Sequence, residues 1–163
     1  MRFALETPRL SLRLRDHADA EWNLELLAEH DPPNVSFGVE EMRERLASQR
    51  VAAMSSGLGL LTVRRRADGA ALGYCGLIVG RSTVDEPEIV YELLRRHHGH
   101  GYATEAARAV VSAAAETGRE RVWATVRPWN AASLRVLDKV GFVRHHADVD
   151  GDGELVYLKR ELS

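Results

Sequence analysis

The sequence has 163 residues, of which 45% are hydrophobic and 28% charged, with a formal net charge of −2, so we expect residues 1–163 to form one domain with an ordinary core. This charge balance gives no general attraction to nucleic acid, and no apolar run is long enough to span a membrane. The lone cysteine cannot form an internal disulfide and the first residues show no signal-peptide pattern, so we expect a cytoplasmic protein.

The first part of the chain predicts a strand followed by two helices. Leucines alternate with polar residues over residues 7–15, which is the period of a half-buried strand. Asp16 stands at the N-cap position of a helix that ends before the Asp-Pro-Pro-Asn segment at residues 31–34. A second helix is predicted over residues 39–54 and ends at Gly57.

Several strands and a long helix are predicted next. Between Tyr102 and Thr117, alanines and valines recur three and four positions apart, which indicates the clearest amphipathic helix of the chain, with Gly118 as a C-cap. The strands that precede this helix are predicted at residues 60–64, 72–79 and 88–94.

The last part of the chain predicts a strand, a helix and a closing hairpin. The strand covers residues 122–126, and Asn130 begins a helix that runs to about Val140 and ends at Gly141. The order of elements is typical of an α/β (α+β) domain with a central mixed, mostly antiparallel sheet and flanking helices. The closing hairpin is predicted from residues 142–146 and 154–161.

The most informative segment is the basic loop at residues 95–103, before the long helix. Gly99 and Gly101 let the backbone turn sharply and approach a ligand. The first amides of the helix have no intrahelical partner and lie at the positive end of the helix dipole, so the loop is suited to a pyrophosphate. The alternative is a solvated, charged loop, and the segment matches neither a Walker loop nor a dinucleotide fingerprint.

Four segments resemble one protein family in the order in which the family has them. They are residues 7–13 (TPRLSLR), 88–91 (EIVY), 99–106 (GHGYATEA) and 130–142 (NAASLRVLDKVGF). They resemble the GNAT superfamily of acetyltransferases, in particular the branch with the RimJ/RimL-type ribosomal-protein N-terminal acetyltransferases. The resemblance implies a GNAT fold, acetyl-CoA as the cofactor, and direct attack of a primary amine on the thioester.

The family's phosphate motif, Gln/Arg-x-x-Gly-x-Gly/Ala, fits in two registers, one beginning at Arg96 and one at His98. We prefer the second, because Tyr-Ala-Thr-Glu-Ala then falls where this branch has it, although His98 replaces the usual Arg or Gln. The resemblance implies that loop amides bind the pyrophosphate and that the strand end before the loop pairs with the pantetheine arm. The implied cofactor contacts are Leu93, Leu94, His98, Gly99, His100, Gly101, Tyr102, Ala103, Asn130 and Ser133.

Acetyl transfer from a thioester to an amine is helped by an acid for the departing sulfur. Ser133 is the candidate acid, because enzymes of this branch place a serine beside the sulfur. Many relatives have a tyrosine seven residues after the asparagine, where this chain has Leu137. Asn130 and Ser133 also have a purely structural interpretation as residues that satisfy the first amides of a helix.

A base for the acceptor amine is expected on the strand before the loop. Glu88 and Glu92 are four residues apart and therefore share a face, whereas Tyr91 projects from the other face. The resemblance aligns Glu88 with a recurrent glutamate, which favours Glu88, and both residues have the alternative interpretation of solvated carboxylates. A peptide α-amine, with a pKa of roughly 7.7–8.0, needs less help from a base than a lysine amine does.

Three functions stay open at the level of sequence: an acetyltransferase for a protein N-terminus or small amine, an antibiotic-modifying acetyltransferase, and a non-catalytic acyl-CoA-binding or regulatory domain. Cys75 lies outside every cofactor segment and is not expected to be a nucleophile. No metal is expected, because the calcium-like segment at residues 148–153 has Lys159 where a glutamate is required. Neither nucleic acid nor a membrane is an expected partner, and a homodimer is compatible with the sequence.

Overall fold

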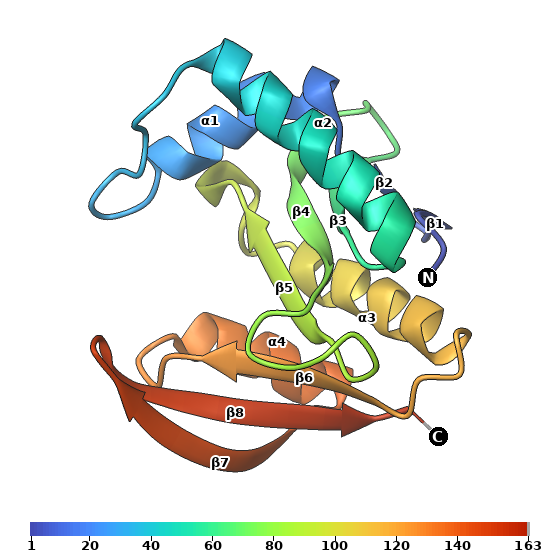
Figure 1. Ribbon diagram of the computed structural model, residues 1–163, viewed down its shortest axis with the longest axis vertical. Coiled ribbons are helices and arrows are strands. Elements are labelled where there is room, and N and C mark those ends of the chain that lie inside the picture. Colours follow the sequence, from blue (N-terminus) through green and yellow to red (C-terminus); the bar gives the residue numbers. More distant parts are fainter. Residues whose placement is uncertain (163) are drawn as a thin grey trace.

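The computed structural model describes residues 1–162 and contains one eight-stranded sheet (Figure 1). The strand order is β1-β2-β3-β4-β5-β6-β8-β7. Neighbouring strands are antiparallel except for β5 and β6, which are parallel. The predicted mixed, mostly antiparallel sheet with flanking helices is confirmed.

The strands are β1 (Ala4–Glu6), β2 (Leu10–Leu14), β3 (Leu60–Arg65), β4 (Ala71–Ile78), β5 (Glu88–Leu93), β6 (Arg121–Val126), β7 (Val143–Asp150) and β8 (Gly153–Glu161). The helices are α1 (Ala20–Ala28), α2 (Val39–Ser56), α3 (Tyr102–Ala115) and α4 (Ala131–Val140), with short 3-10 helices η1 (His17–Asp19) and η2 (Arg95–His97). Within residues 1–162, no helix has the combination of length and apolar character that crossing a membrane requires.

The predicted helix boundaries agree with the structure where capping residues mark them. Asp16 caps η1, which leads directly into α1, and Asn130 caps α4. Gly57 and Gly141 end α2 and α4 in the left-handed conformation. The α3 helix stops at Ala115, before the predicted end, and β1 was not predicted because three residues are too few to show a period.

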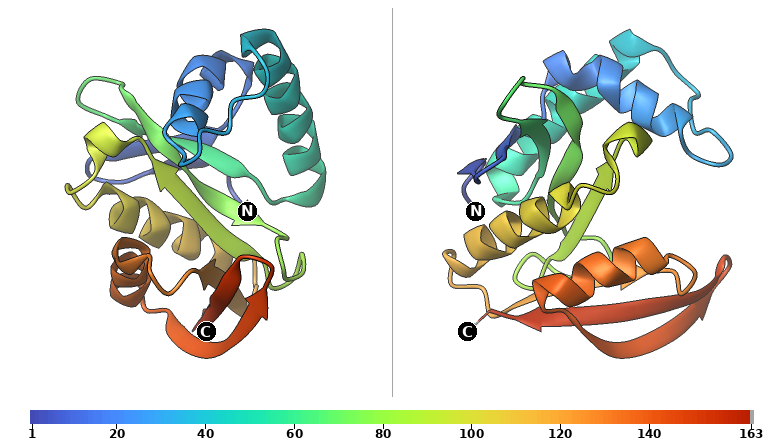
Figure 2. Two further views of the ribbon diagram at one scale, coloured as in Figure 1. Left: turned by 90° about the vertical axis from the view of Figure 1, so that its left-hand side faces the viewer. Right: turned by 180° about the vertical axis from the view of Figure 1, so that it is seen from behind.

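The helices cover the two faces of the sheet separately (Figure 1, Figure 2). α1 and α2 pack together on one face over β4, whereas α3 packs against β4 and β5 on the other face and α4 packs beside β6. The buried stripe of α3 consists mainly of alanine and valine, which lets the helix approach the sheet closely. The N-terminus of α3 is thereby positioned at the end of β5.

Candidate active site

The parallel strands β5 and β6 pair at one position only. Their single bridge joins Glu88 and Trp123, next to a hydrogen bond of 2.8 Å from the Trp123 N–H to the Pro87 carbonyl. In antiparallel pairing with β4, every second residue along β5 directs its N–H and C=O groups toward β4. The Leu94 N–H, just after β5, donates to the Leu72 carbonyl and so sets which residues these are. The N–H and C=O groups of Tyr91 and Leu93 therefore face the side of β6, beyond the bridge, and form an open edge.

The loop after β5 presents a series of unpaired amides. Gly99 and Gly101 have φ angles of +80° and +79°, which favour glycine. The first hydrogen bond of α3 runs from the Glu105 N–H to the Gly101 carbonyl. Within residues 1–162, no acceptor pairs with the N–H groups of residues 99–104. This backbone has the donors that bind a pyrophosphate at a helix N-terminus.

The backbone N–H groups of two predicted cofactor contacts, His98 and Leu94, form hydrogen bonds within the protein. The N–H of His98 donates to Arg95 over 3.1 Å, so the series of free amides begins at Gly99. The N–H of Leu94 donates to Leu72 over 2.8 Å, and its carbonyl accepts from His97 over 2.9 Å. The side chain of His98 also has a partner, since its Nε2 donates to the Leu93 carbonyl over 2.7 Å.

The arginines that precede the loop are directed away from it. Arg95 donates to the carboxylate and the carbonyl of Glu29, and Arg96 pairs with Glu25, so both arginines connect the loop to α1. The cation that contacts the loop is Arg9, whose guanidinium donates to the His100 carbonyl over 2.9 Å. Part of the positive charge near the loop therefore comes from the N-terminal part of the chain.

Arg9 is held by the first turn of α3. Its Nε donates to Glu105 over 2.7 Å, and the Thr7 hydroxyl donates to the same carboxylate over 2.6 Å. Burial raises the pKa of Glu105, but the hydrogen bonds from Thr7 and Arg9 outweigh burial and hold the pKa below its usual value. The segments at residues 7–13 and 99–106 thus meet in space. Beside them lies an open pocket of about 850 Å³, whose lining includes Gly101, Thr104, Arg108 and Lys139.

The candidate acid Ser133 contacts a phenol from β5. The Ser133 N–H donates to the Asn130 side chain over 3.2 Å, which confirms the helix cap. The Ser133 hydroxyl lies 2.8 Å from the Tyr91 hydroxyl. Burial raises the pKa of Tyr91 to about 12, although the hydrogen bond with Ser133 acts in the opposite direction. Tyr91 therefore stays protonated at neutral pH and can donate to Ser133. β5 thus places a phenol beside Ser133, in a protein that has Leu137 where many relatives have a tyrosine.

Glu88, the favoured base, lies inside the protein. Its side chain is 3% exposed, and its carboxylate accepts from the Thr125 hydroxyl over 2.5 Å and from the Arg81 N–H over 3.0 Å. A Cβ at Gly80 would lie 2.3 Å from the same carboxylate. Glu88 anchors the chain between β4 and β5, and we revise the prediction that it receives a proton from the acceptor.

Glu92 is the more accessible of the two carboxylates. Its side chain is 33% exposed and lies 2.6 Å from Nε2 of His30, which is 35% exposed. Its other oxygen accepts from the Tyr74 hydroxyl over 3.1 Å. Burial, and then the Glu92 charge, raises the pKa of Tyr74 well above its usual value. Glu92 therefore belongs to a hydrogen-bonded group on the α1 side of β5, opposite Tyr91.

Cys75 lies on β4 opposite Tyr91 and is fully buried. Burial raises the pKa of its thiol well above the usual value, which removes the thiolate needed for nucleophilic attack.

Three site residues had no assigned role in the sequence. Tyr91 lies in the EIVY motif, and the strand period predicted its side chain on the face opposite Glu88 and Glu92. In the structure, the hydroxyl of Tyr91 contacts Ser133 on that face. Arg9 lies in the TPRLSLR motif, but its contact with the loop spans 91 positions of the chain. His30 precedes the turn at residues 31–34, and no sequence pattern indicates that it contacts β5.

Comparisons with known proteins identify the family. Residues 9–143 match the acetyltransferase (GNAT) domain family. The uncharacterized protein YkkB of Bacillus subtilis (strain 168) is 33% identical over 147 residues, which cover 84% of this chain and 83% of YkkB.

Solved structures show the same fold at low sequence identity. RimL, a ribosomal L7/L12 α-N-protein acetyltransferase in complex with coenzyme A, has a TM-score of 0.83 at 15% identity and 97% coverage of both chains. The ribosomal-protein-S5-alanine acetyltransferase of Vibrio fischeri has a TM-score of 0.82 at 17% identity, with 98% of this chain and 97% of that chain covered. This chain belongs to the GNAT family of acetyltransferases, and it is an N-acetyltransferase whose acetyl donor is acetyl-CoA.

Proposed function

We propose that this enzyme acetylates a single primary amine, with the α-amine of a peptide as the leading acceptor, and that Ser133 and Tyr91 protonate the departing sulfur. The observation that carries the proposal is the 2.8 Å contact between these two hydroxyl groups at the open edge of β5. The free amides at residues 99–104 lie at one end of the same strand.

The two sets of free backbone groups suit the two parts of coenzyme A. The N–H and C=O groups of Tyr91 and the N–H of Leu93 are suited to the amides of the pantetheine arm, which would extend β5 as an additional strand does, whereas the Leu93 carbonyl already accepts from His98. The amides of residues 99–104 are suited to the pyrophosphate. Acetyl-CoA supplies an activated acetyl group, whose thioester is then expected near Ser133.

Ser133 and Tyr91 form a short chain of proton donors. As the amine forms the new C–N bond and the C–S bond breaks, the Ser133 hydroxyl gives its proton to the sulfur and receives one from Tyr91. The Tyr91 proton is then restored from water. Because a thiol pKa near ~8.5 already makes the sulfur a fair leaving group, this pair assists the reaction without dominating it.

Two observations favour a peptide acceptor over a polycationic drug. Glu88 and Glu92 already have partners within the protein, so β5 offers no cluster of free carboxylates to bind several ammonium groups. In addition, the structural relatives named above are described as acting on ribosomal proteins, RimL at an α-amine.

The proposal is tested by measuring thiol release from acetyl-CoA with a panel of acceptors. The panel comprises peptides with free N-termini, N-blocked peptides containing lysine, polyamines, aminoglycosides and free amino acids. We expect turnover with free N-termini only. Ser133→Ala and Tyr91→Phe should each lower kcat about 10- to 100-fold, at or below the lower limit of typical general acid–base catalysis, with little change in the KM for acetyl-CoA.

The matched control is Ser48→Ala, which removes the hydroxyl of an exposed residue on α2 and should leave kcat unchanged. Turnover confined to polyamines or aminoglycosides would contradict the peptide acceptor. Tight binding of coenzyme A without turnover on any acceptor would favour a non-catalytic acyl-CoA-binding function.

A further inference from the structure

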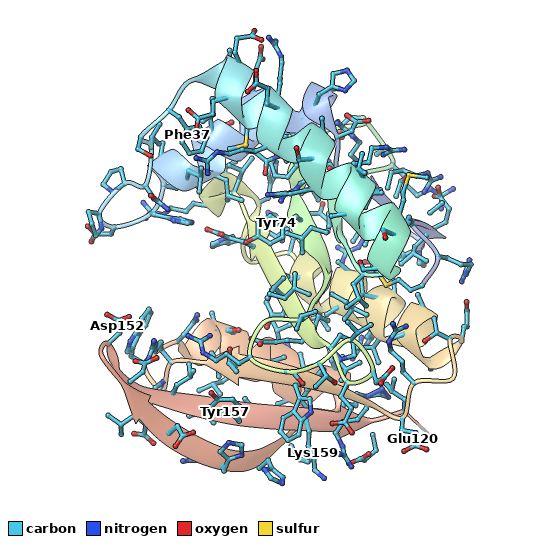
Figure 3. All side chains as sticks on the ribbon, in the orientation of Figure 1. Phe37, Tyr74, Glu120, Asp152, Tyr157 and Lys159 are labelled. Atoms are coloured by element: carbon cyan, nitrogen blue, oxygen red, sulfur yellow. The ribbon has the colours of Figure 1, made fainter. Side chains whose placement is uncertain are left out.

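Three residues from separate parts of the chain meet on the α1 side of β5. His30 follows α1, Tyr74 lies on β4, and Glu92 lies on β5. The Glu92 carboxylate is shared between them, at 2.6 Å from His30 Nε2 and 3.1 Å from the Tyr74 hydroxyl. In Figure 3, Tyr74 lies between the α1–α2 layer and β5. The proposed reaction with Ser133 and Tyr91 leaves this group without a role.

The hydrogen bonds determine how the His30 ring is used. An ionised carboxylate only accepts hydrogen bonds, so His30 Nε2 carries a proton and donates it to Glu92. In a neutral imidazole, the other nitrogen, Nδ1, then has a free lone pair. Within residues 1–162, no group hydrogen-bonds to His30 Nδ1. A carboxylate that fixes the tautomer of a partly exposed histidine is an arrangement suited to general base catalysis.

The group lies next to the edge at which the thioester is expected. Glu92 stands between Tyr91 and Leu93, whose backbone groups form the open edge. Because side chains alternate along a strand, Tyr91 reaches the acid side at Ser133 and Glu92 reaches the opposite side. An amine that approaches from the α1 side would therefore meet His30 on its way to the thioester.

We propose that His30 is the general base that deprotonates the acceptor amine, and that Glu92 and Tyr74 are positioning residues that hold its ring. This inference rests on the proposed function and assigns the base that the buried Glu88 cannot supply.

The proton balance of the reaction is closed by this assignment. His30 Nδ1 takes one proton from the ammonium form of the acceptor and releases it to water. The neutral amine attacks the carbonyl carbon, the C–N bond forms and the C–S bond breaks. The second proton leaves the nitrogen as the amide forms, and the sulfur gains one through Ser133. One proton is released to solvent for each acetyl group transferred.

The charged groups around His30 are themselves held by other parts of the protein. Glu29, its neighbour in the chain, accepts from the Arg95 N–H over 3.0 Å, and the Arg95 guanidinium donates to the Glu29 carbonyl. Arg15 lies 5.1 Å from the centre of the Tyr74 ring and is held by Asn23. Glu92 is thus the carboxylate that contacts the ring, and its partner Tyr74 lies beside Arg15, which follows β2 and is held by α1.

The test compares wild type with His30→Gln and Glu92→Gln, using the best acceptor of the panel from about pH 5 to about pH 9, roughly two units on either side of neutrality. Glutamine at position 30 keeps an N–H donor for Glu92 but cannot accept a proton. We expect His30→Gln to lower kcat about 100-fold, the lower limit of typical general base catalysis, and to remove one deprotonation from the acid limb of the kcat/KM profile. The KM for acetyl-CoA should be unchanged.

A rescue experiment separates a chemical role from a structural one. Free imidazole should restore part of the turnover of His30→Ala, because His30 is partly exposed and imidazole can replace its ring. Glu92→Gln should lower kcat by a smaller factor, because it acts through His30. His17→Gln, which changes an exposed histidine on η1, is the matched control.

The outcomes distinguish this inference from the proposed function. Turnover by wild type with an unaltered pH profile and kcat in His30→Gln would overturn the base assignment and leave the acetyltransferase proposal in place. Absence of turnover by wild type on every acceptor would overturn both.

Discussion

Among the reactive side chains of this protein, burial separates those available for catalysis from those that maintain the structure. Cys75 and Glu88 are almost completely buried, whereas Glu92 and His30 each expose about a third of their side chains. Ser133 and Tyr91 are also partly buried and contact each other. At this scale the chemical type of a residue is a weaker guide to its role than its solvent access and its partners.

Cys75 should be inert in the folded enzyme. Its thiol is buried and its pKa is raised, so the thiolate that reacts with disulfide reagents does not form. We expect no release of chromophore when the native enzyme is mixed with Ellman's reagent, and one equivalent after denaturation. Rapid labelling of the native protein would show that this position opens to solvent.

Glu88→Gln and Glu92→Gln should have opposite effects on stability and catalysis. Glu88 bonds to Thr125 and Arg81 in a buried position, so its replacement should lower the free energy of unfolding by about 1–3 kcal/mol, with only a small effect on kcat. Glu92→Gln should lower kcat and leave stability nearly unchanged. Urea unfolding and steady-state kinetics on both variants measure the contrast, and the reverse pattern would restore Glu88 as the base.

Stability should fall at high pH partly because of Tyr91. Its pKa is about 12 in the folded protein, above the roughly 10 of an unfolded tyrosine, so its contribution is fully present below about pH 10 and is lost as pH rises toward 12. Chemical unfolding between pH 9 and 11 should therefore show a shallower fall for Tyr91→Phe than for wild type, by at most ~1.4 kcal/mol per pH unit. Parallel curves would show that the phenol is not buried as described.

At the scale of elements, the site is formed by three boundaries: the end of β5, the start of α3 and the start of α4. The amides at the start of α3 point outward because the helix leaves them unpaired, whereas the Asn130 side chain takes up one amide of α4. The segment between β1 and β2 supplies Arg9 to the same loop. Elements far apart in sequence thus contribute backbone donors and a cation to one place.

Gly101→Ala and Gly57→Ala form a matched pair. Their φ angles are +79° and +76°, so an alanine should destabilise each by about 1–2 kcal/mol. Only Gly101 lies in the phosphate loop, and only Gly101→Ala should weaken acetyl-CoA binding, by about tenfold, which corresponds to ~1.4 kcal/mol. Thermal unfolding and calorimetric titration of both variants measure the two effects. Equal affinities in the two variants would exclude the loop from cofactor binding.

At the scale of the whole molecule, the two parts of the sheet are joined by few contacts at the parallel pair. The antiparallel strands β1–β5 carry α1 and α2 on one face, and β6–β8 form a second antiparallel group beside α4 (Figure 1). A single bridge joins β5 to β6. A molecule that occupies the open edge would contact both groups of strands.

Saturating acetyl-CoA should therefore stabilise the whole fold. At about 100 times Kd, linkage predicts ~2.7 kcal/mol, which corresponds to an increase in Tm of about 5–10 °C for a protein of this length. Hydrogen exchange should slow at the amides of Tyr91, Leu93 and residues 99–104. The same exchange rates with and without acetyl-CoA at these amides would show that the cofactor binds elsewhere.

Features that depend on neighbouring residues were predictable from the sequence by itself. Periodicity and capping residues determined α2, α3 and α4, and the order of elements together with the family motifs determined the fold and the family. Each of these features is set by side chains within a few positions of one another, so a linear sequence contains the whole signal.

The assignment of individual roles was decided only by the tertiary structure. The burial of Glu88, the contact of Tyr91 with Ser133 and the approach of His30 to Glu92 depend on packing between segments about 40 to 60 positions apart in the chain. The hydrogen bond of the Leu94 amide to Leu72 likewise depends on the pairing of β4 with β5. Solvent access and hydrogen-bond partners are properties of the packed molecule, and they determine which of several chemically similar residues can transfer a proton.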